Sequence, residues 1–221
     1  MNELVERDHL ISLIKYINNL HKIQSLKWID STKEPINLKT RKIRDLFSES
    51  ESNEQNEANN LSTEFLKYLN VYCDNLNMLA TEPEFDLLPQ DLHSRSRVKD
   101  PDSRVAKLLH YMNGKSEAGK VGINKCLNDL MGFRVWLNDH KHGKHNCELL
   151  KEELSSEGVS VRVHDSCKED YKATHIYFSN ENNKFFPWEL QIWNHKDHES
   201  NISSHSEHKQ GYTKWVENYK Q

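Results

Sequence analysis

Apolar residues recur at three- and four-residue steps in several stretches of the chain, and this spacing predicts amphipathic helices. The longest such stretch covers residues 4–23, and a shorter helix is expected over residues 35–47. A third helix should begin at Ser62 or Thr63, which are residue types preferred at N-caps. A fourth should follow Asp100, because an aspartate N-cap and a proline at the first helical position favour a helix start there.

A different period, of two residues, runs through residues 131–137 and predicts a buried strand. The odd-numbered residues of this stretch form an apolar face, and Arg134 falls on the other face. Alternating valines predict a second strand over residues 159–163. Residues 176–179 and 188–192 are expected to pair as a hairpin, with the core on one side of each strand.

Residues 48–60 (SESESNEQNEANN) break both patterns, because they are acidic, low in complexity and poor in apolar side chains. Such a segment buries too little surface to offset the entropy lost on ordering, so we expect a flexible linker. We therefore predict a helical extension over residues 1–90, with this linker inside it, and a second domain over residues 91–221.

The charge of the chain is nearly balanced, with 30 Lys and Arg against 34 Asp and Glu among 221 residues. A net charge of -4 gives no overall nucleic-acid signature, so any site for an anionic ligand must be a local basic patch. The four cysteines are scattered without a Cys-x-x-Cys pair, which fits a reducing compartment. Neither a signal peptide nor a membrane span is expected, and the prediction is a cytoplasmic protein.

Candidate chemistry begins at Asp129, just before the strand at 131–137, where a carboxylate can hold a divalent ion. Strict alternation would place Asp129 with Met131, so the chain must bend there to bring it toward Arg134. Gly132 removes a side chain beside Arg134 and suits the close approach of a ligand. Glu189 points out of a strand too apolar to be an edge, and it is expected to line a cleft.

Basic residues gather around the helix that follows Asp100. Arg97 and Lys99 come just before the helix, while Ser103 and Lys107 are four residues apart and share a face. Cations beside a helix N-terminus make a place for phosphates. The alternative is a capped surface helix with scattered charges.

Two further groups of residues invite a functional interpretation. Tyr171 offers a flat ring for a base, Lys172 a charge for phosphate, and His175 faces the same way as Tyr171 in an extended backbone. A separate cluster of soft ligands consists of His140, His142, His145 and Cys147. A zinc site is one interpretation of this cluster, but its spacing follows no standard zinc finger.

In their order along the chain, these motifs resemble the synthetase domain of the RelA/SpoT family. The matching pieces are Arg97-x-Lys99-x-x-x-Ser103-x-x-x-Lys107, Asn128-Asp129-x-x-Gly132-x-Arg134, Tyr171-Lys172-x-x-His175, Glu189-x-Gln191-Ile192 and Glu207-His208-Lys209. The resemblance covers about residues 95–212. It implies an α/β fold, a nucleotidyltransferase-like mixed β-sheet flanked by helices, and pyrophosphokinase activity. The N-terminal helical extension predicted above from apolar spacing matches no part of the family that we can name.

The resemblance also implies a role for each matching residue. Arg97, Lys99, Ser103, Lys107 and Arg134 would bind ATP; Asp129 and Glu189 would be catalytic and would hold Mg²⁺; Tyr171, Lys172, His175, Gln191 and Asn194 would bind the acceptor. Within this set, Glu189 would accept the proton of the acceptor's 3′-hydroxyl, and Tyr171 would stack on its base. Such a site agrees with the needs of phosphoryl-type transfer, which are alignment and cations on developing charge.

The sequence departs from the family pattern in two places that affect function. Asp170 stands where the family often has Gly, and Trp193-Asn194 stands where it usually has Arg followed by Thr or Asn. Three activities therefore remain open. The first is pyrophosphate transfer from ATP to GDP or GTP, which gives (p)ppGpp. The second is a toxin-type enzyme, neutralised by an antitoxin, that modifies the 3′ end of tRNA or makes (p)ppApp.

The third is an inactive nucleotide-binding regulator. The presence of both Asp129 and Glu189 argues against this third activity, since a binding module has less need of two carboxylates. The absence of a strongly basic composition disfavours a large RNA partner.

Overall fold

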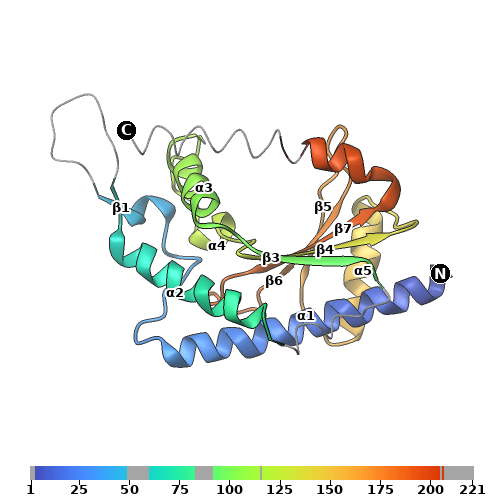
Figure 1. Cartoon of the computed structure of the whole chain (residues 1–221), viewed down its shortest axis with the longest axis horizontal. Helices are drawn as coiled ribbons and strands as arrows, with labels where there is room; N and C mark the ends of the chain where they lie inside the picture. The colour runs from blue at the N-terminus through green and yellow to red at the C-terminus, as the bar shows by residue number, and fades with distance from the viewer. Residues whose placement is uncertain (1–2, 49–59, 83–91, 115, 205, 207–221) are drawn as a thin grey trace.

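A mixed five-stranded sheet, in the order β3-β4-β7-β6-β5, forms the centre of the protein in this computed structural model (Figure 1). The structure describes residues 3–48, 60–82, 92–114, 116–204 and 206. The strands are β3 (Ser94–Val98), β4 (Met131–Leu137), β5 (Arg162–Asp165), β6 (Thr174–Phe178) and β7 (Trp188–Asn194). The central pair, β4 and β7, is parallel, and the other neighbours are antiparallel.

Three helices cover one side of the sheet, which we call the inner face: α1 (Glu3–Ser31), α2 (Thr63–Leu79) and α5 (Lys144–Ser156). The opposite side, the outer face, is flanked by α3 (Pro101–Asn113) and by helical residues 198–204 (Figure 1). The shorter elements are η1 (Ile43–Leu46), β1 (Phe47–Ser48), β2 (Asn60–Leu61), α4 (Ile123–Cys126) and η3 (His195–Asp197). The predicted α/β class, with a mixed sheet flanked by helices and a helical N-terminal part, is confirmed.

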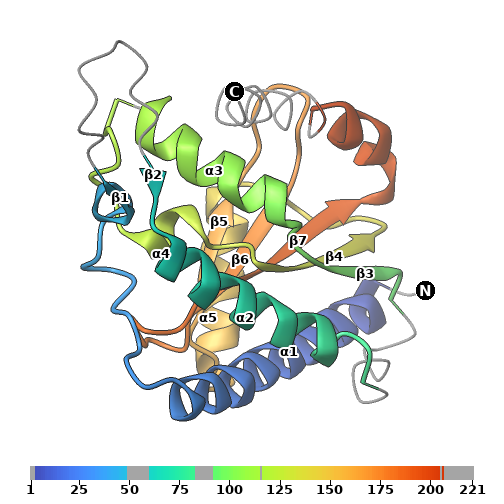
Figure 2. The same cartoon turned by 60° about the vertical axis from the view of Figure 1, so that its left-hand side comes forward.

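The inner face and its helices share one hydrophobic core. The odd-numbered residues of β4 are at most 4% exposed, as their period of two predicted. From α1, Leu10, Leu13, Ile14 and Ile17 join the same core at 0–1% exposure. Helices α1 and α2 lie side by side (Figure 2), and the Trp28 ring contacts the rings of Tyr68 and Tyr72.

The predicted helix starts are confirmed in detail. Ser62 caps α2 by accepting a hydrogen bond from the backbone N–H of Phe65. Asp100 caps α3 by accepting one from the backbone N–H of Ser103 at 2.8 Å, with proline at the first helical position. A side-chain acceptor at the N-cap satisfies one of the N–H groups that the first helical turn leaves unpaired.

The helix predicted over residues 35–47 is wrong, because only the short η1 forms there. Asn37 turns the chain instead, since its Oδ1 accepts hydrogen bonds from the backbone N–H groups of Lys39 and Thr40. Several backbone groups then bond to distant loops, for example the N–H of Leu38 to the carbonyl of Asn183 at 2.8 Å. Bonds to remote segments have replaced the i to i+4 bonds that a helix would need.

The strand predicted over residues 159–163 begins later, at Arg162. The N–H of Val159 still bonds to the carbonyl of Leu154 and thereby closes the end of α5, with Gly158 in the left-handed region at φ 77°. At the ends of the first apolar stretch, Leu4 is 73% and Ile23 41% exposed, so neither joins the core.

Two predictions concern segments that the structure does not describe. Most of the linker predicted over residues 48–60, and the division predicted at residue 90, lie outside the described residues. Among the described helices, none is both long and apolar enough to cross a bilayer.

Candidate active site

The outer face of the sheet carries most of the predicted site residues, and the strand register arranges them in two rows across all five strands. The first row is Arg97, Gly132, Glu189, Tyr177 and Arg162, and the second is Arg95, Arg134, Gln191, His175 and His164. Basic side chains stand at both edges of the sheet, while β7 contributes Glu189 and Gln191 at its centre. A ligand on this face would meet cations on either side of a carboxylate.

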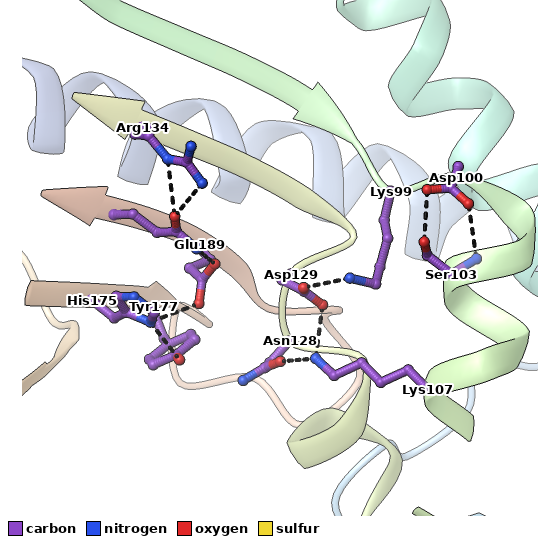
Figure 3. A network of polar contacts seen from close by, with 11 residues as sticks. Lys99, Asp100, Ser103, Lys107, Asn128, Asp129, Arg134, His175, Tyr177 and Glu189 are labelled. Carbon is purple, nitrogen blue, oxygen red and sulfur yellow. Dashed lines mark hydrogen bonds and ion pairs between the residues drawn. The ribbon is translucent and has the colours of Figure 1, made fainter. Parts of the chain in front are cut away.

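Asp129 holds together an ion network at one end of this face. Its Oδ2 accepts a hydrogen bond from Lys99 Nζ at 2.8 Å, and its Oδ1 accepts one from Lys107 Nζ at 3.0 Å (Figure 3). The Lys107 ammonium also donates to Asn128 Oδ1 at 3.0 Å. Lys99 follows β3, Lys107 lies on α3, and Asp129 precedes β4, so one carboxylate joins three segments.

Glu189 is the second carboxylate, and it is 7% exposed in the middle of β7. Its Oε1 lies 3.0 Å from His175 Nδ1, and its Oε2 accepts a hydrogen bond from Gln191 Nε2 at 2.8 Å. The other ring nitrogen, His175 Nε2, lies 2.9 Å from the Tyr171 hydroxyl. Because a carboxylate can only accept, the imidazole donates from Nδ1, and in its neutral form its Nε2 accepts the proton of Tyr171.

Both carboxylates lie on the same side of the sheet (Figure 3). The chain leaves strand geometry before Met131, where β4 begins, so Asp129 avoids the inner face as the sequence required. Gly132 lies between Arg97 and Glu189 in the first row, and a Cβ built on it would come no closer than 3.9 Å to Arg97. Because Gly132 has no side chain, the sheet surface between Arg97 and Glu189 is not covered at this position.

Arg134 is held in place from two directions. Its Nε and Nη2 donate to Gln191 Oε1 at 3.1 and 2.9 Å, and its guanidinium carbon lies 3.5 Å from the ring centroid of Trp193. Burial, together with the neighbouring Arg97 and Arg95, lowers the pKa of Arg134 to about 10. This value is far above neutrality, so Arg134 remains a fixed cation against an aromatic face.

The loop that presents Tyr171 is clamped at both sides. Lys168 and Tyr171 exchange backbone hydrogen bonds of 2.9 and 2.8 Å across a tight turn. Asn201, which is fully buried, then accepts from the backbone N–H of Lys172 at 2.8 Å and donates to its carbonyl at 2.9 Å. The Tyr171 hydroxyl and the His175 ring meet because these contacts fix the backbone between them.

Charge compensation keeps both carboxylates ionised. Burial raises the pKa of Asp129, but the ammonium groups of Lys107 and Lys99 outweigh burial and hold the pKa far below its usual range. Burial likewise raises the pKa of Glu189, while the contact with the His175 imidazole outweighs it and leaves this pKa lowered. A buried carboxylate stays charged when cations or hydrogen-bond donors replace its lost hydration.

The donor set suits a magnesium ion that arrives with a polyphosphate. Mg²⁺ in proteins is commonly bound by one or two carboxylates together with substrate phosphates, and Asp129 and Glu189 are the two carboxylates on this face that could hold it. All four of their oxygens, however, already accept hydrogen bonds within the protein. Within the described part of the chain, no group of three or more His, Cys, Asp or Glu side chains is placed to hold a metal.

Seven of the predicted residues other than these carboxylates gather on this face: Arg97, Lys99, Lys107, Arg134, Tyr171, His175 and Gln191. The hydroxyl of Ser103, also predicted to bind ATP, donates to Asp100 Oδ2 at 2.8 Å and is thus part of the α3 cap. The Lys172 ammonium is turned toward Asp197, at 3.8 Å, and its side chain is 56% exposed.

Asn194 is not brought to the site. It follows the inner-face parity of β7 and is 2% exposed, and its side chain bonds to the backbone N–H and carbonyl of His140 at 2.7 and 3.0 Å. This placement does not support the predicted role of Asn194 in acceptor binding. The motif Glu207-His208-Lys209 lies outside the described residues.

Several residues on the same face were missed. Arg162 and His164 are exposed on β5, and the guanidinium carbon of Arg162 lies 5.0 Å from the Tyr177 ring. The alternating valines contained the signal for these residues, since the intervening positions must face outward. Asn201 carried no such signal, because its contact with Lys172 depends on a distant helix.

The histidine cluster that suggested zinc is organised around a hydroxyl group. His140 Nε2 lies 3.1 Å and His142 Nδ1 3.0 Å from Thr174 Oγ1. Burial, with His142 and Arg7 nearby, lowers the pKa of His140 to about 3, so this ring is neutral at physiological pH. The cluster fastens the segment after β4 to β6.

Similar solved structures include small alarmone synthetase 2 from Bacillus subtilis, at 20% identity and a TM-score of 0.35, over 70% of this chain and 91% of that one. Small alarmone synthetase 1 from the same organism is 16% identical, with a TM-score of 0.33 and coverage of 71% and 89%. A further similar structure comes from the complex of the Type VI effector Tas1 with its immunity protein. It is 13% identical, with a TM-score of 0.30, over 59% of this chain and 60% of that one. Neither a protein-family model nor a curated protein sequence matches the chain.

Proposed function

We propose that this protein is a pyrophosphokinase that transfers pyrophosphate from ATP to the 3′-hydroxyl of GDP or GTP. The observation that supports this most strongly is the pair of carboxylates, the part-buried Asp129 and the buried Glu189, on one face of the sheet with lysines and arginines around them (Figure 3). Phosphoryl-type transfer depends on alignment and on cations that stabilise developing charge, and this face offers both.

In the proposed reaction, the 3′-oxygen of the acceptor attacks the β-phosphorus of ATP. A bond forms between these two atoms, the bond from the β-phosphorus to the oxygen bridging to the α-phosphate breaks, and AMP leaves. Glu189 takes the hydroxyl proton, because it is ionised and lies at the centre of the face. General-base help of this kind is worth about 10²–10⁴ in rate.

The donor is assigned to the end of the face where Lys99, Lys107 and Arg97 lie. Their positive charges would bind the triphosphate, and Arg134, fixed by Gln191, would neutralise charge on the group in transit. Mg²⁺, when bound to Asp129 and Glu189 with the donor, would add Lewis-acid stabilisation of the phosphoryl oxygens.

The acceptor is assigned to the side of Tyr171 and His175. Their contact fixes both rings, and burial raises the pKa of Tyr171 to about 12, so its hydroxyl stays protonated. A fixed phenol ring suits stacking on a base.

A second candidate acceptor is the 3′ end of tRNA, in a toxin-type enzyme restrained by an antitoxin protein. It is favoured by Trp193, a fully buried aromatic residue at the position where the family resemblance led us to expect an arginine. One cation fewer at this position suits an acceptor with fewer phosphates near its reacting sugar. An adenosine nucleotide, giving (p)ppApp, is a further acceptor of this class.

One assay tests both candidates. The full-length protein is incubated with Mg²⁺ and γ-labelled ATP, and with GDP, GTP, an adenosine nucleotide or deacylated tRNA in separate reactions. Transfer of label to one acceptor, lost in Glu189→Gln, would support the function and identify the acceptor. If none of these acceptors takes up label, the proposal is rejected, and a nucleotide-binding regulator is the remaining alternative.

A further inference from the structure

Asp129 and Glu189 have partners of different kinds. Each oxygen of Asp129 is held by an ammonium group, at 2.8 Å from Lys99 and 3.0 Å from Lys107. The oxygens of Glu189 are held by an imidazole and a carboxamide, which donate hydrogen bonds without a fixed full charge. The charge balance of the metal-binding carboxylates is therefore concentrated on Asp129.

We propose that Lys99 and Lys107 form a cationic lock on Asp129, so that the protein binds a divalent cation only together with a polyphosphate. This inference rests on the function proposed above. It adds a rule for the order of binding: neither free Mg²⁺ nor free Mn²⁺ occupies the site, and the metal enters with the donor nucleotide.

The lock follows from competition for the same lone pairs. A divalent cation on Asp129 would need an oxygen that already accepts a hydrogen bond from Lys99 or Lys107, and it would lie close to both ammonium groups. The side chains of all three residues are only 12–13% exposed, so water screens this repulsion poorly. The lysines must therefore find another anion before Asp129 can accept a metal.

A polyphosphate is such an anion. Lysine carries its charge on a flexible four-carbon stem and moves readily between acceptors. Lys99 and Lys107 approach Asp129 from the segment after β3 and from α3, and their ammonium groups meet at its carboxylate, at the end of the face to which the donor is assigned (Figure 3). Phosphate oxygens that draw the two ammonium groups away would expose Asp129 and also supply the remaining ligands of the metal.

The coupling must act in both directions. If a polyphosphate raises the affinity for the metal, then the metal raises the affinity for the polyphosphate by the same factor. Removal of one lysine should uncouple the two ligands in a specific way. The affinity for the metal alone rises, because one oxygen of Asp129 is released from its ammonium partner, while the affinity for the polyphosphate falls.

Electron paramagnetic resonance of Mn²⁺ measures this directly on the full-length protein and requires no turnover. Mn²⁺ is titrated into wild type with and without an ATP analogue whose α–β bridge is a methylene group, and into Lys99→Met and Lys99→Arg without nucleotide. Lys125→Met is the matched control, since the Lys125 side chain is 62% exposed and pairs with Glu117 at 3.7 Å and not with Asp129. Thermal melts confirm that each variant is folded.

We expect wild type to bind Mn²⁺ at least about tenfold more tightly with the analogue than without it, a difference of about 1.4 kcal/mol. Without nucleotide, Lys99→Met should bind Mn²⁺ more tightly than wild type by a similar factor. The double variant Lys99→Met/Asp129→Asn should lose this increase in affinity. Lys99→Arg keeps the positive charge and should resemble wild type, as should Lys125→Met.

Equal Mn²⁺ affinity of wild type with and without the analogue would overturn the proposal, as would a Lys99→Met variant that gains none. A gain in Lys99→Arg equal to that in Lys99→Met would also overturn it, because charge would then not be the cause. The proposed function is tested separately by the transfer assay. If the protein gives all the expected titrations but transfers no pyrophosphate, the lock on Asp129 is supported and the proposed activity is rejected.

Discussion

The two faces of the five-stranded sheet are built from alternate residues of the same strands, yet different forces hold them together. Along β7, Leu190 and Ile192 are fully buried in the hydrophobic core, while Glu189 and Gln191 are almost as buried, at 7% exposure, on the other side. Burial alone therefore does not distinguish the core of this protein from its candidate site. Chemical type and strand parity together do.

The difference has consequences for substitutions. On the inner face, many non-directional contacts share the stabilisation, and a truncation costs transfer free energy plus a cavity. On the outer face, the buried Glu189 and Gln191 have named hydrogen-bond partners, and removing one partner leaves the other unpaired in a poorly hydrated place. Inner-face changes should mainly alter stability, and outer-face changes should mainly alter chemistry.

The largest expected effect tests the outer face. Glu189→Gln keeps the shape of the side chain and an oxygen that can accept from His175, but it removes the base. We expect pyrophosphate transfer to fall about 10²–10⁴-fold, while the melting temperature stays near that of wild type. The measurement is label transfer from ATP at saturating acceptor. Near-normal transfer by this variant would remove Glu189 from the chemistry.

The next effect tests the inner face. Leu150 on α5 is fully buried in the core, and Leu150→Ala should lower the free energy of unfolding by about 2–5 kcal/mol. The rate of transfer per folded molecule should not change. Leu149→Ala is the matched control, because Leu149 is on the same helix but 48% exposed. Urea unfolding measures the free energy of unfolding of both variants. An equal decrease in Leu150→Ala and Leu149→Ala would contradict the assignment of Leu150 to the core.

A third effect comes from a polar residue inside the inner-face layer. His21 is fully buried; its Nε2 donates to the carbonyl of Phe186 at 3.1 Å and its Nδ1 accepts from Asn180 at 2.7 Å. This arrangement requires the neutral ring, and burial lowers the pKa of His21 to about 4 from an ordinary value of 6.5. The unfolded chain therefore binds a proton at a higher pH than the folded protein does.

The sign of the pH dependence follows from this difference. The contribution of His21 to stability is complete above pH 6.5 and is lost as the pH falls toward 4, by roughly 3 kcal/mol in total. His21→Gln should flatten the fall in unfolding free energy between pH 6.5 and 4 relative to wild type. Urea melts at several pH values measure it. Parallel curves for the two proteins would show that the ring does not resist protonation.

The sequence predicts the inner face better than the outer face, for a physical reason. Apolar periodicity predicted the core of β4, and N-cap residue types predicted the start of α2 and the cap of α3, because each of these depends on residues close in the chain. Residues 35–47 formed no long helix, since their backbone bonds to loops around Gly119, Val121 and Asn183. Local spacing contains no information about such distant partners.

The candidate site shows the same limit. Motif order indicated Asp129 and Glu189, and strand alternation placed Glu189 outward, but the pairing of Asp129 with two lysines needs the strand register and the position of α3. Asn194 was assigned to the acceptor from its place after the Gln191 motif, whereas the parity of β7 turns it inward. Its role in the fold is visible only once β4 and β7 are paired.

The smallest effect concerns the support of the outer face by residues 198–204. Asn201 makes two hydrogen bonds to the backbone of Lys172 and so holds the loop of Tyr171. Asn201→Ala should cost about 1–2 kcal/mol of stability and raise the KM for the acceptor severalfold, with the KM for ATP unchanged. Asn201→Asp, which can still accept from the N–H of Lys172, should lie between this variant and wild type. Steady-state kinetics with each substrate varied in turn measure the two KM values. Equal changes in both KM values would mean that Asn201 supports the whole fold and not the acceptor side.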